Sequence, residues 1–229
     1  MRPRGFTLVE LLVVIVIIAA LAGLSAPMIL KQQKSAARTE AISNAKQIGL
    51  ALIEFEQEYQ SFPDQTTAEE VADSTGTSLS FSGTKSNDYF RQLIATVVDS
   101  EEVFYAKTAY TGKPDNVTSA GDALAAGEVG FGYIMLDSTT AQNMSGNSGR
   151  PVLATPLLDA QEDWTFDPDP FGAKAVVWRL DNSAKAHTIR ETDNKLTIGK
   201  GKRLEQTGRD TVWGTSVNPH MSAPEKRGG

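Results

Sequence analysis

The sequence has no cysteine and only two histidines among 229 residues. Without cysteine the chain has no disulfide, no thiolate metal ligand and no cysteine nucleophile. Positive charge is also scarce, with 22 Lys and Arg against 28 Asp and Glu and a net charge of -6. A nucleic-acid-binding protein needs a basic surface to replace the counterions of the phosphates. We therefore predict no specific nucleic-acid partner.

Short motifs of common catalytic sites are absent as well. The sequence contains no G-x-S-x-G elbow, no Walker loop and no H-E-x-x-H pair. His187 falls in a predicted strand and His220 in a tail rich in proline and glycine, and we interpret both as structural or exposed. Trp164, Trp178 and Trp213 are predicted core residues. We predict no catalytic residue and expect the chain not to be an enzyme.

What the sequence does contain is a long apolar run near its start. Leu11 to Leu30 are 20 residues without a charge. At about 1.5 Å per residue, a helix of this length covers the hydrocarbon core of a bilayer, roughly 30 Å. No A-x-A cleavage site followed by a loop comes after the run, so we expect it to stay in the mature protein as a membrane-spanning helix.

A short basic leader precedes this run. Residues 1–5 include two arginines and end in Gly5, and Phe6-Thr7-Leu8-Val9-Glu10 follows. This pattern resembles the class III signal of type IV pilins and of the pseudopilins of type II secretion. The resemblance implies that a prepilin peptidase in the membrane cleaves between Gly5 and Phe6 and methylates the new N-terminus of Phe6.

The resemblance also implies an orientation. Basic residues flank the apolar run on both sides, so charge alone leaves the topology open. A peptidase acting at the cytoplasmic face would place the leader in the cytoplasm. The helix would then span the bacterial inner membrane once, with the rest of the chain in the periplasm.

Glu10 is a carboxylate at the edge of the apolar run. Such a charge costs a few kcal/mol in a membrane and usually marks a function or has a partner. Within one helix, the amine that cleavage creates on Phe6 lies about 6 Å along the axis, so an intramolecular pair is possible. The family resemblance implies instead that Glu10 pairs with the Phe6 amine of a neighbouring subunit during filament assembly. A third alternative is that Glu10 only reaches the polar interface.

Gly23 and Pro27 predict a weak point in this helix. Pro27 has no N–H for the carbonyl of Gly23, and glycine is itself a poor helix former. The pair predicts a kink, or local unwinding of the kind that the resemblance implies for packed filaments. A simple kink in a lipid-exposed helix is the alternative.

The helical pattern continues past the apolar run. Apolar residues recur at intervals of three and four, the pattern of one helix face, at Ala41, Ala45, Ile48, Leu52, Phe55 and Tyr59. Pro63 disfavours helical geometry in the residue before it and predicts the end of the helix. We predict one helix over residues 6–60.

The sequence pattern after the long helix predicts a globular α+β head. Short helices are predicted at 67–74 and at 87–100, the second capped by Asn87 or Asp88. Runs typical of strands, separated by turn residues, follow at 102–110, 128–136, 151–158, 174–180 and 195–199. The fold class is therefore a long N-terminal helix packed on an antiparallel sheet with short extra helices. We divide the chain into a leader (1–5), a transmembrane and assembly helix (6–30), an amphipathic helix (31–60) and the head (61–229).

The best candidate for a metal is the segment with Asp163, Asp167 and Asp169. An EF-hand that starts at Asp167 would need oxygen ligands where Phe171 and Trp178 stand, so this motif fails. We predict no cofactor and no metal site. A calcium-binding loop remains an alternative to simple Asp-Pro turns.

Together these observations predict a structural subunit of a type IV pilus or of a type II secretion pseudopilus. The implied partners are further copies of the chain, other pilins or pseudopilins, the prepilin peptidase, an assembly platform in the inner membrane, and lipid before assembly. The product would be a periplasmic pseudopilus or a pilus on the cell surface. The alternative is a periplasmic or extracellular binding protein or enzyme that uses the helix only as a membrane tether.

Overall fold

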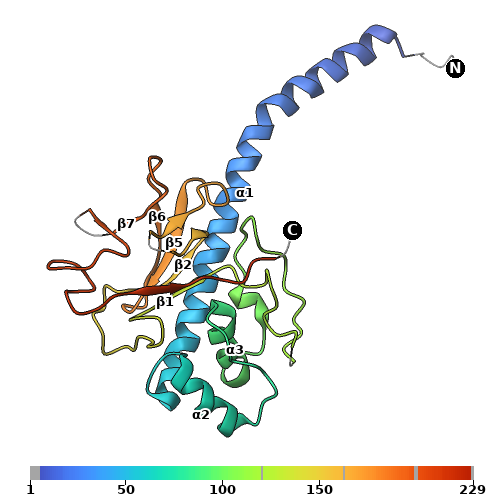
Figure 1. Cartoon of the computed structure of the whole chain (residues 1–229). Coiled ribbons are helices and arrows are strands. Elements are labelled where there is room, and N and C mark those ends of the chain that lie inside the picture. The colour runs from blue at the N-terminus through green and yellow to red at the C-terminus, as the bar shows by residue number, and fades with distance from the viewer. Residues whose placement is uncertain (1–5, 120, 162, 199–200, 228–229) are drawn as a thin grey trace.

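One long helix organises the molecule. The computed structural model describes residues 6–119, 121–161, 163–198 and 201–227. Helix α1 (Leu8–Tyr59) has 52 residues, which corresponds to about 78 Å of axial length. Its first half projects away from the rest of the chain and its second half runs through the head (Figure 1). The predicted helix is confirmed, with small changes at both ends.

Local contacts determine where α1 begins and ends. Thr7 caps the start of α1, and Gln60 ends it in the left-handed conformation at φ 61°. Phe62 then leaves the helix direction and donates its N–H to the carbonyl of Gln142 (3.1 Å). The chain thus turns away before Pro63, so the proline follows the helix end and does not set it.

The second half of α1 forms the centre of the core. The predicted stripe is confirmed, since all six residues are at most 6% exposed: Ala41, Ala45, Ile48, Leu52, Phe55 and Tyr59. Because this stripe follows the helical period, it presents one continuous apolar face to the sheet.

The sheet against which α1 packs has five antiparallel strands. They are β1 (Gly132–Met135), β2 (Pro151–Thr155), β5 (Lys174–Arg179), β6 (Ala184–Thr188) and β9 (His220–Ser222), in the order β6-β5-β2-β1-β9. This arrangement confirms the predicted α+β fold. Strand β9 was not predicted: His220 lies in a strand that pairs with β1, opposite Met135, and not in an irregular tail.

Alternation along the strands creates two cores. Side chains on one face of the sheet meet α1, among them Tyr133, Met135, Val176 and Trp178. Their neighbours face the other side, where a second cluster contains Ile134, Ala154, Ala175 and Val177. The second cluster is covered by two small hairpins, β3 (Leu157–Asp159) with β4 (Thr165–Phe166) and β7 (Thr197–Ile198) with β8 (Lys202–Arg203). Trp164 and Trp213 are buried there, which confirms that all three tryptophans are core residues.

Short helices complete the head near the C-terminal end of α1. Helices α2 (Gln65–Thr75) and α3 (Ser86–Thr96) confirm the two predicted short helices, although α3 ends four residues before the predicted end at 100 (Figure 1). The predicted cap of α3 was wrong: the N-cap is Lys85, whose backbone N–H donates to the carboxylate of Asp88 (2.9 Å). The predicted strand at 102–110 was also wrong, because it begins with the 3-10 helix η1 (Glu101–Phe104) and continues as irregular chain.

A close approach joins α1 to the sheet. A Cβ atom built on Gly49 would lie 2.2 Å from the ring of Trp178, a fully buried residue of β5. The indole N–H of Trp178 is directed to Asn182 Oδ1 (3.2 Å), in the turn between β5 and β6. Glycine at position 49 is therefore required by packing, because any larger side chain would hold α1 away from the sheet.

We expect Gly49→Ala to destabilise the head although alanine is the better helix former. Overpacking of this kind costs about 1–3 kcal/mol. The matched control is Gly23→Ala in the same helix, where an added Cβ would meet nothing within 4 Å. Thermal unfolding of the full chain in detergent should show a lower midpoint for Gly49→Ala and an unchanged head transition for Gly23→Ala. Equal midpoints for both variants would contradict the packing argument.

Candidate functional site

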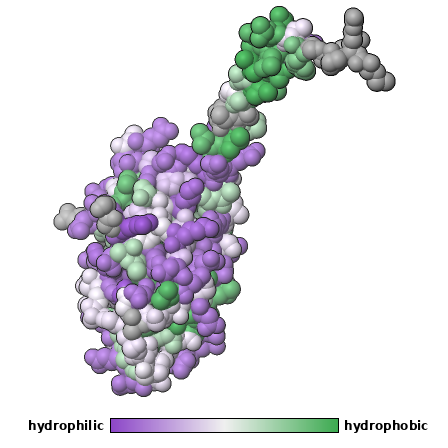
Figure 2. All heavy atoms as spheres, turned by 90° about the vertical axis from the view of Figure 1, so that its right-hand side faces the viewer, coloured by the Kyte–Doolittle hydropathy of each residue, from purple (hydrophilic) through white to green (hydrophobic). Residues whose placement is uncertain are grey.

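The projecting half of α1 is apolar and uncovered. Every side chain described between Phe6 and Leu30 is exposed, and among the described residues α1 is the one helix long and apolar enough to cross a membrane. Figure 2 shows this half as a hydrophobic column that leaves a largely hydrophilic head. A soluble surface does not carry an apolar area of this size unless lipid or another protein covers it.

Glu10 is held at the start of this column by Thr7. The hydroxyl and the backbone N–H of Thr7 both donate to Glu10 Oε2, at 2.7 and 2.8 Å. In return, the backbone N–H of Glu10 donates to Thr7 Oγ1 (3.3 Å). The two residues form a capping box, and the carboxylate lies in the first turn, where the unpaired N–H groups of a helix favour an anion.

Thr7 was missed by the sequence analysis. The spacing Thr-x-x-Glu before an apolar run is a known signal for a capping box and identifies this contact from sequence alone. Phe6, the predicted methylation site, is 77% exposed beside the cap. Gly5, the other half of the predicted cleavage site, lies outside the described residues.

The predicted weak point is helical in this structure. The helix assignment of α1 runs without interruption through Gly23 and Pro27. Unwinding at these residues was predicted for packed filaments, so it stays a prediction for that state.

The start of the second half of α1 is fastened to the head by polar contacts. Lys34 Nζ lies 2.6 Å from Asp169 Oδ1, and Arg38 Nη1 donates to the carbonyl of Phe171 (3.3 Å). Both partners belong to the loop between β4 and β5. These contacts lie where α1 enters the head, so they help to define how the helix leaves it.

The three aspartates considered for calcium have separate roles. Asp163 forms an ion pair with Lys195 (2.6 Å), and Asp169 pairs with Lys34 on α1. Asp167 Oδ1 accepts the backbone N–H of Asp169 (2.9 Å), as in an Asp-Pro turn. Among the described residues, these carboxylates do not form one of the groups close enough to share an ion.

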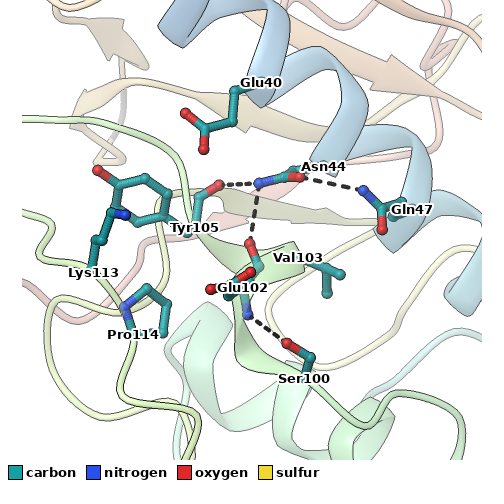
Figure 3. Close-up of a pocket in the computed structure, with 9 residues that line it drawn as sticks. All are labelled: Glu40, Asn44, Gln47, Ser100, Glu102, Val103, Tyr105, Lys113 and Pro114. Atoms are coloured by element: carbon teal, nitrogen blue, oxygen red, sulfur yellow. Dashed lines mark hydrogen bonds between the residues drawn. The ribbon is translucent and has the colours of Figure 1, made fainter.

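A cavity of about 340 Å³ lies between α1 and the segment that follows α3. Figure 3 shows Asn44 of α1 bridging this gap. Its side-chain amide donates to the carbonyls of Glu102 (3.1 Å) and Tyr105 (2.9 Å). Asn44 thereby fastens η1 to the helix, and the cavity walls are mainly polar side chains that surround this link.

His187 lies on β6, as predicted, beside a cation. Its Nε2 is 3.2 Å from Arg179 Nη2. Burial lowers the pKa of His187 to about 4, and the nearby charges of Arg179, Lys185 and Lys174 act in the same direction. His187 is therefore neutral at pH 7, which suits a structural role.

Comparison with known proteins identifies the N-terminal segment. Residues 1–26 match the family model described as prokaryotic N-terminal methylation motif. This is the signal of type IV pilins and pseudopilins. The prepilin-type signal includes the predicted positions Gly5, Phe6, Glu10 and Gly23 and ends one residue before Pro27. Comparisons with curated proteins and with solved structures gave no match.

The prepilin-type signal and the structure agree. The matched segment is the leader and most of the exposed apolar half of α1, and the head begins after it. The signal supports a precursor of the pilin-like or pseudopilin kind, and the single long apolar helix among the described residues fits anchoring in a membrane.

The lowered pKa of His187 predicts how the stability of the folded chain depends on pH. Between its folded value of about 4 and the ordinary value of 6.5, the unfolded chain binds more protons at this residue than the folded chain. Stability from this group is therefore present above pH 6.5 and lost as the pH falls toward 4. We expect His187→Gln to lose less stability than the wild type over this window. Denaturant unfolding at pH 7, 5.5 and 4.5 measures it, and parallel losses in both proteins would contradict the prediction.

Proposed function

We propose that the chain is a structural subunit of a type IV pilus or of a type II secretion pseudopilus, cleaved after Gly5 and polymerised through α1. One observation carries the proposal. A single continuous helix starts with a prepilin-type signal, exposes an apolar surface over its first half and forms the core of the head with its second half. Such a chain has a folded head attached to an apolar segment that lipid or protein has to shield from water.

Polymerisation would shield this apolar segment with neighbouring subunits. Before assembly, the acyl chains of the inner membrane surround the apolar half of α1, with the head on the periplasmic side. In a filament, neighbouring copies of α1 replace the lipid. Repeated head-to-tail contacts of this kind generate open helical polymers. Prepilin peptidase, an inner-membrane assembly platform and other pilins or pseudopilins are the partners that this route needs.

Glu10 is proposed to pair with the Phe6 amine of the neighbouring subunit. The capping box holds the Glu10 carboxylate at the backbone N–H of Thr7, the residue next to Phe6, so acid and amine lie at the same end of α1. A charge at the edge of the membrane is expensive, and a charge-assisted contact between subunits offsets this cost only after polymerisation. The pair therefore favours the filament over the membrane-stored state.

Gly23 and Pro27 are proposed to let the helix adjust when it packs. The carbonyl of Gly23 has no N–H partner at Pro27, so unwinding here breaks fewer hydrogen bonds than elsewhere in α1. Local lengthening at this point would adapt the apolar halves to a common register while the capping box and the head stay intact.

Processing is tested by the mass of the N-terminus. In a host that has prepilin peptidase, we expect the mature chain to start at Phe6 and to carry one additional methyl group. The measurement is intact and N-terminal peptide mass spectrometry on protein purified from membranes. A chain that still starts at Met1 would contradict the proposal and favour the membrane tether.

Assembly is tested by Glu10→Gln, a variant that keeps the capping box because glutamine also fills the third position of this motif. Only the charge is lost. One charge-assisted hydrogen bond is worth about 1.5–3 kcal/mol, so we expect filament yield to fall at least about tenfold with membrane insertion unchanged. Sheared filaments and membrane fractions are quantified by immunoblotting.

The matched control for this experiment is Glu58→Gln, the same change at an exposed acid near the other end of α1. Its filament yield should equal that of the wild type. Normal filaments from Glu10→Gln would refute the role of the charge, and a wild type that forms no filament or oligomer in its native host would support the tether instead.

A further inference from the structure

Three acidic side chains converge in the segment between α3 and β1. Glu101 opens η1, Asp115 lies in the irregular chain that follows, and Glu128 lies just before β1. One carboxylate oxygen from each residue lies within 4.8 Å of those of the other two. Consecutive members of these three residues, called here the acidic triad, are 14 and 13 positions apart, so the fold brings them together.

The centre of the triad is buried. Glu101 is fully buried and Glu128 is 9% exposed, while Asp115 is exposed. Glu101 Oε1 accepts the backbone N–H of Leu124 at 2.5 Å. Glu101 Oε2 is buried and, among the described residues, has no hydrogen-bond partner.

The surrounding chain holds the other carboxylates in place. Glu128 accepts the backbone N–H groups of Ala125 (2.7 Å) and Asp115 (3.1 Å). Within the described part of the chain, no Lys or Arg forms an ion pair with any member of the triad. A buried carboxylate oxygen without a donor is costly, and three clustered acids without a cation repel one another.

The electrostatics agree with this geometry. Burial raises the pKa of Glu101, against the bond from Leu124, and the charges of Glu128 and Asp115 raise it further.

We propose that Glu101, Asp115 and Glu128 bind a divalent cation, Ca²⁺, that occupies the space in front of Glu101 Oε2. All side-chain donors are carboxylate oxygens, which hard cations prefer. Irregular chain segments suit the flexible coordination of Ca²⁺, and the exposed side at Asp115 leaves room for water ligands.

Calcium at this site would link three segments of the chain. The triad joins η1 to the two chain segments that contain Asp115 and Glu128, and Asn44 fastens η1 to α1 (Figure 3). This part of the head has little regular secondary structure and, in a chain without cysteine, no disulfide. Binding would therefore stabilise the segment and its attachment to the long helix.

The experiment uses the full chain in detergent micelles after treatment with a chelator. Calorimetric titration with CaCl₂ should show binding, and the thermal midpoint should rise by roughly 3–6 °C at a tenfold excess of free Ca²⁺ over its dissociation constant. MgCl₂ should shift the midpoint less. No response of the wild type to millimolar Ca²⁺, or an equal response to Mg²⁺, would overturn the proposal.

Variants locate the site. Glu101→Gln should abolish the calcium shift and, without calcium, unfold at or above the wild-type midpoint, because it removes a buried charge. Asp115→Asn changes an exposed side chain, so it should fold in any case and weaken binding at least tenfold. A full calcium response in Asp115→Asn would overturn the proposal.

Two control variants test whether calcium binds elsewhere in the head. Glu70→Gln, an exposed acid on α2, should respond to calcium as the wild type does. Asp167→Asn should also keep the response. Loss of the response in Asp167→Asn together with its retention in Asp115→Asn would assign calcium to residues 163–169 and refute the triad. Because these measurements concern the isolated chain, they stand or fall independently of filament formation.

Discussion

The structure depends on one constraint: a single helix has to satisfy two different surroundings. Through most of its length, α1 pairs its backbone groups internally, which is the condition for a segment to enter a membrane, and Pro27 is the interior exception because it has no N–H for the carbonyl of Gly23. Its side chains divide near residue 31, with an exposed apolar half before this point and an amphipathic half after it. At the start of the helix, where backbone N–H groups have no partner in the preceding turn, Thr7 and Glu10 provide the cap. The acid in the prepilin-type signal thus has a structural role in the single chain, in addition to the intersubunit role that we propose.

The head is built to hold the second half of α1 without disulfides. The sheet supplies a regular apolar face to α1. The chain between α3 and β1 has no such face, and polar side chains hold this segment in place. Asn87 donates to the carbonyls of Leu124 (2.8 Å) and Ala125 (3.2 Å), and Arg91 Nε donates to that of Ala123 (2.8 Å). A segment held by buried polar contacts has to satisfy every one of its polar atoms, and Glu101 is where the described contacts fall short.

The sequence predicts those parts whose pattern is local. The helix over the apolar run and the stripe from Ala41 to Tyr59 are confirmed. The β-rich runs predicted as strands at 151–158 and 174–180 contain β2 and β5, and β2 stops at Thr155. The predicted strand at 102–110 failed because contacts with helices hold this segment without strand pairing. Phe104 is buried and stacks on Phe90 of α3, and Asn44 of α1 binds the carbonyls of Glu102 and Tyr105. Strand β9 has three residues, and its partner β1 lies more than 80 positions away, so no local pattern identifies it. The acidic triad escaped prediction for the same reason, since its spacing matches no loop motif.

Magnitudes show which contacts fix the projecting half of α1 to the head. The ion pair between Lys34 and Asp169 is exposed on both sides and contributes at most about 1 kcal/mol. Burial of one large apolar side chain contributes about 1.5–3 kcal/mol, and Ile48, Leu52 and Phe55 are all fully buried against the head. The ion pair and the bond from Arg38 therefore orient the helix at its exit, while the apolar stripe carries the attachment. In a filament held together by the apolar halves, a pull on the head reaches the rest of the assembly through this stripe. Because Gly49 lets α1 approach Trp178, the same close packing determines both the stability of the head and its attachment to the projecting half of the helix.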